Sequence, residues 1–239
     1  MGRLFLVRHA QASFLSQNYD QLSARGETQA RLLGEYWAKH NVVFDRACSG
    51  PALRHRQTAQ LVCEAYRKAG RDFPSSLIMD EFDEFQGDAV LSQTLPELSA
   101  NNDRIREFHG ALQNSTDEAS KRANFQRLFQ AVISLWVDGK IAPPGVESWE
   151  SFCERVNRGL STFLGKAKQG ELGVIFTSGG PVSVAVQRAL HLSAQDTLQI
   201  AWMPRNCSLS EFLFSGDRFA LSSFNSFPHL DNESLLTHR

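Results

Sequence analysis

An arginine and a histidine stand side by side near the N-terminus, directly after a short apolar run. The run is Leu4-Phe5-Leu6-Val7, and the two polar residues are Arg8 and His9. A guanidinium can hold a phosphate by two parallel hydrogen bonds, and an imidazole beside it can offer a ring nitrogen to the phosphorus atom. The pair is therefore a candidate for phosphoryl chemistry, although an Arg-His dipeptide taken alone is more often part of a surface turn.

A second polar segment, residues 49–59, predicts the start of a helix. Ser49 can cap a helix that begins near Pro51, because the missing N–H of proline costs nothing in the first turn. Arg54 then lies in about the first turn, where the helix dipole favours an anion. Arg56 is two positions further on and faces another direction. We therefore expect Arg54 but not Arg56 to reach a bound anion, the alternative for either being a solvated helix face.

A third segment, residues 177–181, joins an apolar run to a further helical pattern. Ser178 is followed by Gly179 and Gly180, which allow a close approach of the backbone to a ligand. Free N–H groups at the start of a helix can cradle an anion. A Gly-Gly turn is weak evidence by itself, so this segment gains weight only together with the other two.

The elements that must position these residues alternate between strands and helices. Fully apolar runs are typical of strands that helices cover on both faces. Strands are expected at 4–7, around 46–48, at 172–177, 208–214 and 219–224, with a turn at 215–217. Apolar residues at helical spacing follow Gly26, precede Gly70, and recur over 125–136 and, after a Ser148 cap, over 149–163. Their aromatic residues are interpreted as core.

The predicted fold class is α/β: a three-layer α/β/α sandwich with a mostly parallel central sheet and a helical insertion. Ligands bind at the carboxyl ends of parallel strands, which is where the three polar segments fall. We expect a single domain over 1–239, with the insertion lying over the sheet at about 87–146. Substrate selectivity is expected in this insertion, where four polar residues could meet a leaving group: Arg104, Arg106, His109 and Lys121.

Composition excludes several other classes. The chain has 239 residues, with 25 Lys and Arg against 26 Asp and Glu, so it has no electrostatic footprint for nucleic acid or an anionic membrane. No apolar stretch approaches the roughly 20 residues of a membrane span, and residues 4–7 are too short for a signal peptide. The cysteines lack the close pairs of a zinc or redox motif; they are Cys48, Cys63, Cys153 and Cys207. Reduced cysteines favour a cytoplasmic protein.

Taken in order, the motifs resemble the histidine phosphatase superfamily, which includes the phosphoglycerate mutases and many phosphatases. Arg8-His9-Ala10 stands where the family has Arg-His-Gly, and Leu22 to Ala30 follows a Leu-x-x-x-Gly-x-x-Gln-Ala pattern. Ser49 to Ala59 is similar to Ser-x-x-x-x-Arg-x-x-Gln-Thr-Ala. The resemblance spans about 3–85 and 146–229.

The resemblance implies a role for each residue. His9 would accept the phosphoryl group, while Arg8 and Arg54 would clamp its oxygens. A family glutamate would protonate the departing oxygen and later activate water. Glu84 is favoured because Asp83-Glu84-Phe85 looks like a form seen in some members, and Glu81 is the competing candidate. No metal or cofactor is implied, because arginines and backbone N–H groups compensate the charge.

Three positions depart from the family or lie at its edge. Ser178 stands where the family has a second histidine; a hydroxyl can donate one hydrogen bond but cannot carry positive charge. We expect Ser178 and Gly179 still to bind phosphate, with weaker charge compensation. Ala10 adds one methyl group beside the site. His229 resembles a His-Leu near the C-terminus of many members and is interpreted as structural.

The leading prediction is a phosphatase that hydrolyses a small phosphate monoester through a phosphohistidine intermediate. A phosphoglycerate mutase is one alternative, although Ser178 counts against it, and a phosphate-binding pseudo-phosphatase is another. A serine hydrolase with Ser178 on a strand-to-helix elbow would need Gly two residues on either side. Gly180 fits that pattern, but Phe176 is too bulky. The substrate's identity and the oligomeric state stay open.

Overall fold

The computed structural model describes residues 1–13, 20–165, 167–168 and 170–238, and the chain divides into two compact units. The first unit joins Met1–Glu84 to Arg155–Arg239, and the second is Phe85–Glu154. The insertion expected at about 87–146 falls within the second unit. That it lies over the sheet as part of one domain stays a prediction.

The first unit contains a mixed sheet of six strands. They are β1 (Gly2–Arg8), β2 (Arg46–Ser49), β3 (Ser76–Ile78), β4 (Leu172–Thr177), β5 (Leu209–Ser215) and β6 (Arg218–Ser226). The order is β3-β2-β4-β1-β5-β6, with β3, β2, β4 and β1 parallel and β5 and β6 antiparallel at one edge. Because β1 is paired on both sides and covered on both faces, Leu4, Leu6 and Val7 are fully buried.

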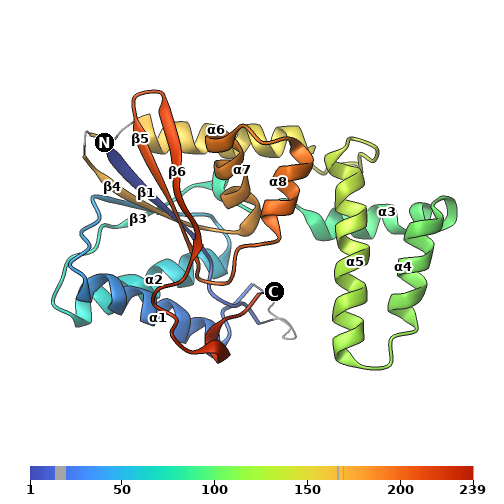
Figure 1. Ribbon diagram of the computed structural model, residues 1–239, viewed down its shortest axis with the longest axis horizontal. Helices are drawn as coiled ribbons and strands as arrows, with labels where there is room; N and C mark the ends of the chain where they lie inside the picture. The colour runs from blue at the N-terminus through green and yellow to red at the C-terminus, as the bar shows by residue number, and fades with distance from the viewer. Residues whose placement is uncertain (14–19, 166, 169, 239) are drawn as a thin grey trace. The chain divides into compact units, whose positions relative to one another are not determined.

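Helices cover both faces of this sheet (Figure 1). One face carries α1 (Ala24–Lys39) and α2 (Leu53–Lys68); the other carries α7 (Gly179–Leu190) and the part of α6 (Trp149–Gly165) that belongs to the first unit. Further elements are α8 (Ala194–Ala201) and the 3-10 turns η1 (Asp80–Phe82) and η2 (Glu233–Leu235). The arrangement confirms the predicted α/β/α sandwich with a mostly parallel sheet.

An aromatic cluster fills the core between the sheet and the α1–α2 layer. The ring centroids of Trp37 and Phe44 lie 4.8 Å apart, and those of Tyr66 and Phe73 lie 4.9 Å apart. Burying one such side chain stabilises the fold by roughly 1.5–3 kcal/mol. The interpretation of Trp37 and Tyr66 as core residues is confirmed, since both are almost completely buried.

The start of α1 explains the glycine of the Leu22–Ala30 motif. Ser23 caps the helix by accepting a hydrogen bond from the Gly26 N–H at 3.1 Å. A Cβ atom on residue 26 would lie 2.0 Å from the carbonyl oxygen of Gln11. Glycine therefore lets α1 approach the loop after β1 more closely than any other residue would.

The predicted N-cap of α2 is wrong, although the helix does begin near Pro51. Ser49 is the last residue of β2, and the helix begins at Leu53 after an N-cap at Ala52 that makes no side-chain hydrogen bond. A carboxylate from elsewhere in the chain takes the place of the expected cap: Asp20 Oδ2 accepts the Leu53 N–H at 2.7 Å. The Ser49 hydroxyl is attached to an extended strand four residues before the helix and cannot make this bond.

The second unit is helical and has its own aromatic core. It contains α3 (Gly87–Asn101), α4 (Asp103–Gln113), α5 (Glu118–Val137) and residues 149–154 of α6. Trp136 stacks on Phe85 at 5.4 Å and meets Trp149 edge-on at 5.7 Å. The Ser148 cap of α6 is confirmed by its hydroxyl, which accepts the Ser151 N–H at 3.1 Å. The core interpretation of the apolar stripes at 125–136 and 149–163 is confirmed except at Phe125, which is half-buried. The buried members are Leu128, Phe129, Val132, Trp136, Trp149, Phe152, Val156, Leu160 and Phe163.

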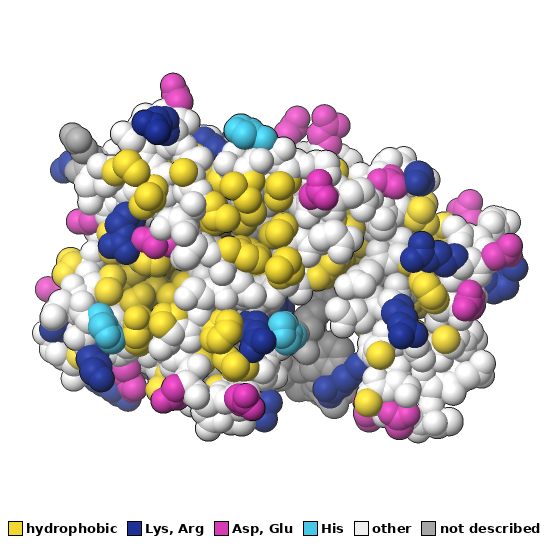
Figure 2. Space-filling model, in the orientation of Figure 1, with side chains coloured by type: hydrophobic (Ala, Val, Ile, Leu, Met, Phe, Trp, Pro, Cys, Tyr) yellow, Lys and Arg dark blue, Asp and Glu magenta, His cyan; other side chains and the backbone are white. Residues whose placement is uncertain are grey.

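The surface carries mixed charge. On the face drawn in Figure 2, basic and acidic side chains are interspersed over both units, in keeping with a net charge of -1. Among the described residues, every helix is too short or too polar to cross a bilayer.

Candidate active site

His9 is held at the carboxyl end of β1 by its backbone. Its N–H donates to the carbonyl of Thr177 on β4 at 2.7 Å, and its carbonyl accepts the Cys207 N–H at 3.1 Å. His9 is only 8% exposed. Its position is therefore fixed by these backbone hydrogen bonds at the end of the sheet and by the residues packed around it.

The hydrogen bonding of the His9 ring fixes which nitrogen is free. Nδ1 lies 2.8 Å from the carbonyl oxygen of Ala10. A carbonyl only accepts hydrogen bonds, so Nδ1 carries the hydrogen and Nε2 carries the lone pair. Burial, followed by the charges of Arg54 and Arg8, lowers the pKa of His9 well below its usual value. The ring is therefore a neutral imidazole whose lone pair is on Nε2.

Motif residues on the two helices of the α1–α2 layer hold the loop that follows His9. The Ala10 N–H donates to Thr58 Oγ1 at 3.1 Å, and that hydroxyl donates to the Arg54 carbonyl at 2.7 Å. The Gln11 N–H donates to Gln29 Oε1 at 2.8 Å. Thr58 and Gln29 thus hold the loop that follows His9.

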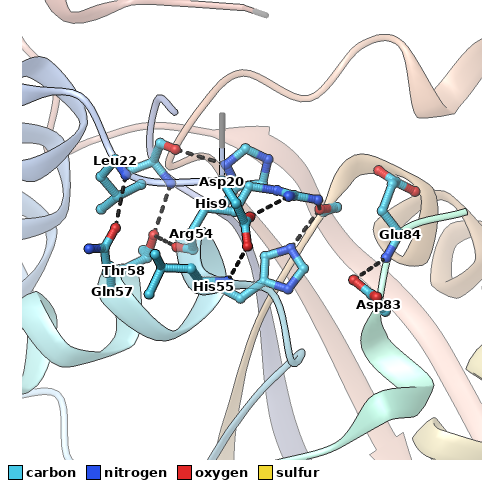
Figure 3. Close-up of polar contacts among 12 residues, drawn as sticks. His9, Asp20, Leu22, Arg54, His55, Gln57, Thr58, Asp83 and Glu84 are labelled. Carbon is cyan, nitrogen blue, oxygen red and sulfur yellow. Dashed lines mark hydrogen bonds and ion pairs between the residues drawn. The ribbon is translucent and has the colours of Figure 1, made fainter. Parts of the chain in front are cut away.

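Arg54 lies in the first turn of α2 and faces His9 (Figure 3). Its Nη1 pairs with Asp20 Oδ1 at 2.6 Å, and its Nη2 lies 3.4 Å from Ser178 Oγ. Its charge is one cause of the lowered pKa of His9. The structure thus brings together the imidazole and guanidinium that the sequence pointed to, whereas Arg56 is exposed.

Arg8 is the last residue of β1 and directly precedes His9. Its side chain is buried, and Nη1 donates to the carbonyl of Pro204. The positive charge still reaches the site, because it contributes to the lowered pKa of His9.

Of the two candidate glutamates, only Glu84 reaches the start of α7. Its Oε2 accepts the Gly180 N–H at 3.2 Å. Glu81 packs elsewhere: a Cβ on Gly159 of α6 would lie 2.6 Å from the Cβ of Glu81. The guanidinium of Arg155 donates to the carbonyl of Glu81 at 3.0 Å, which holds this segment in place.

Asp83 adds a second carboxyl group next to Glu84. Its Oδ1 accepts the Glu84 N–H at 2.9 Å. Burial raises the pKa of Asp83, and the hydrogen bond from the Glu84 N–H, followed by the charge of Arg54, partly opposes that rise. No role was predicted for this aspartate from the sequence. In the structure its side chain holds the backbone of Glu84 in place.

Ser178 follows β4 as the N-cap of α7, and Gly179 is the first residue of that helix. Ser178 is 1% exposed, and its hydroxyl contacts Arg54 and His55. A Cβ on residue 179 would lie 2.8 Å from the carbonyl of Ala201, so glycine is needed where α7 packs against the end of α8. Backbone N–H groups at this helix start remain suited to an anion.

Two residues at the site, Asp20 and His55, were not predicted from the sequence. Asp20 pairs with Arg54 from 34 positions earlier, and no local pattern marks it. His55 lies next to Arg54 and touches Ser178 from 123 positions away. The available signal was its place between Arg54 and Arg56 in a short basic run. Helical spacing alone did not show which way the His55 ring points.

His229 does not belong to this cluster. Its ring lies 6.4 Å from that of Tyr36 on α1, and burial lowers the pKa of His229 to about 4. Its ring nitrogens have no hydrogen-bond partner within the part of the chain that the structure describes. It is a neutral core histidine, in agreement with the structural interpretation.

Comparison with known proteins now identifies the family. The model of the histidine phosphatase superfamily (branch 1) matches residues 4–135 and 100–226. The chain belongs to the histidine phosphatase superfamily. No protein of curated function matches the chain.

Solved structures of this superfamily's fold resemble the chain over nearly its full length. A phosphoserine phosphatase from Entamoeba histolytica, in complex with phosphoserine, has a TM-score of 0.63 and 18% identity, over 96% of this chain and 100% of that one. The same enzyme with 3-phosphoglyceric acid has a TM-score of 0.62 and 17% identity, with the same shares covered. A mycobacterial glucosyl-3-phosphoglycerate phosphatase with inorganic phosphate has a TM-score of 0.61 and 19% identity, over 96% of this chain and 99% of that one. At these identities the likeness shows the fold.

Proposed function

We propose that this histidine phosphatase is a phosphomonoesterase that forms a phosphohistidine at His9. The observation that carries the proposal is the state of the His9 ring: Nδ1–H donates to the Ala10 carbonyl, so the lone pair of Nε2 is free to attack. Arg54 faces the same ring and can compensate the charge of a phosphoryl group.

The reaction has two balanced steps. In the first, Nε2 of His9 forms a bond to phosphorus, the bond to the leaving oxygen breaks, and the Glu84 carboxyl group gives that oxygen a proton. In the second, the Glu84 carboxylate takes a proton from water, the resulting hydroxide attacks phosphorus, and the P–N bond breaks to release inorganic phosphate. Placement of Glu84 at the Gly180 N–H supports this role over Glu81.

The direction of the His9 pKa shift gives the proposal a pH signature. Because burial and nearby arginines depress this pKa, the ring stays unprotonated and nucleophilic at pH values below 6.5. We expect the acid limb of kcat/KM to fall well below pH 6.5 rather than at it.

The substrate is proposed to be a small phosphorylated molecule, as bound by the neighbours that carry phosphoserine or 3-phosphoglyceric acid. Selectivity is proposed to lie in the helical unit, where Arg104, Arg106 and Lys121 are exposed. We propose a cytoplasmic location, supported by four cysteines that are all unpaired, and we propose no nucleic acid as a partner.

The test compares wild type, His9→Ala and His40→Ala on an aryl phosphate. His40 is an exposed histidine at the end of α1, so its replacement is the matched control. We expect phosphate release by wild type and His40→Ala, and a loss of at least about 10³-fold in His9→Ala. A rapid acid-free quench should capture an acid-labile phosphohistidine in wild type and in His40→Ala but not in His9→Ala. Activity retained by His9→Ala would refute the mechanism.

The same experiment separates the alternatives. A phosphoglycerate mutase would move the phosphoryl group between hydroxyls without releasing inorganic phosphate. A pseudo-phosphatase would bind phosphate in every variant and turn over in none.

A further inference from the structure

The hydroxyl of Ser178 is aimed away from the helix that it begins. Serine at an N-cap usually accepts a hydrogen bond from the helix, but Ser178 makes no such bond to α7. Its Oγ lies 2.6 Å from His55 Nε2 and 3.4 Å from Arg54 Nη2. The hydroxyl is therefore committed to two side chains of α2.

His55 is buried with a single hydrogen-bonding nitrogen. The side chain has no exposed surface, and Nδ1 has no partner among the described residues. Space for the ring comes from glycine: a Cβ on Gly50 would lie 2.4 Å from Nδ1. His55 thus occupies a fitted position beside Ser178, and the centroid of its ring lies 5.6 Å from that of His9.

The missing partner decides the tautomer of His55. Burial and then the charge of Arg54 lower its pKa well below the usual value, so the ring is neutral and carries one N–H. A buried N–H without an acceptor is costlier than a buried lone pair without a donor. The hydrogen is therefore on Nε2, and Nε2–H donates to Ser178 Oγ.

A count of hydrogen bonds then fixes the direction of the Ser178 proton. A hydroxyl has two acceptor lone pairs and one donor hydrogen. The guanidinium of Arg54 and the imidazole of His55 fill both lone pairs, so the hydrogen is left to donate. Two donors to the same oxygen also strengthen its own O–H as a donor.

We propose that His55 is a positioning residue that turns Ser178 into a directed hydrogen-bond donor for the phosphoryl group on His9. Ser178 touches the substrate, and His55 acts through it. The family has a histidine where this chain has Ser178, and His55 on α2 thus replaces that histidine in part. His55 orients the Ser178 hydroxyl but supplies no positive charge. This inference rests on the proposed function, because it names the group that receives the bond.

The test is a double-mutant cycle of Ser178→Ala, His55→Leu and the pair. Leucine keeps the buried volume and removes the hydrogen bond. We expect Ser178→Ala to lower kcat/KM by about 10²-fold, and His55→Leu to lower kcat/KM by most of that factor. The double variant should be no slower than Ser178→Ala within about twofold, since His55 has no other route to the substrate. Losses that multiply would overturn the proposal.

Two conservative variants separate orientation from bulk or charge. The amide of His55→Gln reaches the place of Nε2 and should retain most of the activity, whereas that of His55→Asn is too short and should behave like His55→Leu. Equal activity of the two would overturn the proposal, as would a glutamine variant as slow as leucine. This comparison stands even where the leucine variant fails to fold.

A binding measurement distinguishes this inference from the proposed function. The same cycle is run by calorimetry with inorganic phosphate, which requires no turnover. If wild type binds phosphate without hydrolysing an ester, the proposed function fails, and non-additive losses in affinity still support the His55–Ser178 unit. Additive losses in affinity would refute that unit whatever the activity.

Discussion

Replacing Glu84 by glutamine tests the assignment of the proton donor. The change removes the proton that Glu84 would transfer but keeps a side-chain oxygen for the Gly180 N–H, which Glu84 accepts at 3.2 Å. The start of α7 should therefore stay in place. Any loss of rate then reports proton transfer rather than a displaced helix.

The size of the effect follows from the leaving group. General acid catalysis contributes about 10²–10⁴-fold, or roughly 3–5 kcal/mol of the barrier at 1.36 kcal/mol for each tenfold change. An alkoxide is a poor leaving group and needs the proton, whereas p-nitrophenolate leaves without it. We expect Glu84→Gln to lower kcat/KM by 10²–10⁴-fold on an alkyl phosphate and far less on p-nitrophenyl phosphate.

Glu81→Gln is the matched control. Glu81 lies three residues earlier and packs against Gly159 of α6, away from the start of α7. Steady-state rates of phosphate release are measured for both variants on both esters. Glu81→Gln should stay within about twofold of wild type. The assignment would be refuted if Glu81→Gln lost kcat/KM, and lost more of it on the alkyl ester than on the aryl ester, while Glu84→Gln lost none.

Two further predictions concern stability. Thr58→Val keeps the side-chain shape but leaves the Ala10 N–H without its 3.1 Å acceptor, so urea unfolding should show a loss of about 1–3 kcal/mol; unchanged stability would show that Thr58 does not hold the loop. His229 has a folded-state pKa of about 4, below the roughly 6.5 of an unfolded chain, so it favours unfolding increasingly as the pH falls from 6.5 towards 4. Unfolding at pH 7 and pH 5 should show His229→Leu losing about 2 kcal/mol less than wild type on acidification; parallel losses would contradict this.

The elements of the fold were largely predictable because their signals are local. The apolar run at residues 4–7 is the centre of β1, and the segment 172–177 is β4 with the same bounds. The start of α2 was not predictable in the same way. A serine and a proline near position 50 looked like a cap, but the strand before them extends to Ser49 and the cap comes from Asp20.

The sequence by itself determined the chemical groups of this site: an imidazole after a buried strand, a guanidinium in a first helical turn, and a serine where the family has a histidine. Each follows from neighbours within a few positions. Only the tertiary structure decided that Glu84 rather than Glu81 meets α7, and that His55 meets Ser178. These contacts join residues 96 and 123 positions apart. Their geometry depends on strand order and helix rotation, which no local pattern encodes.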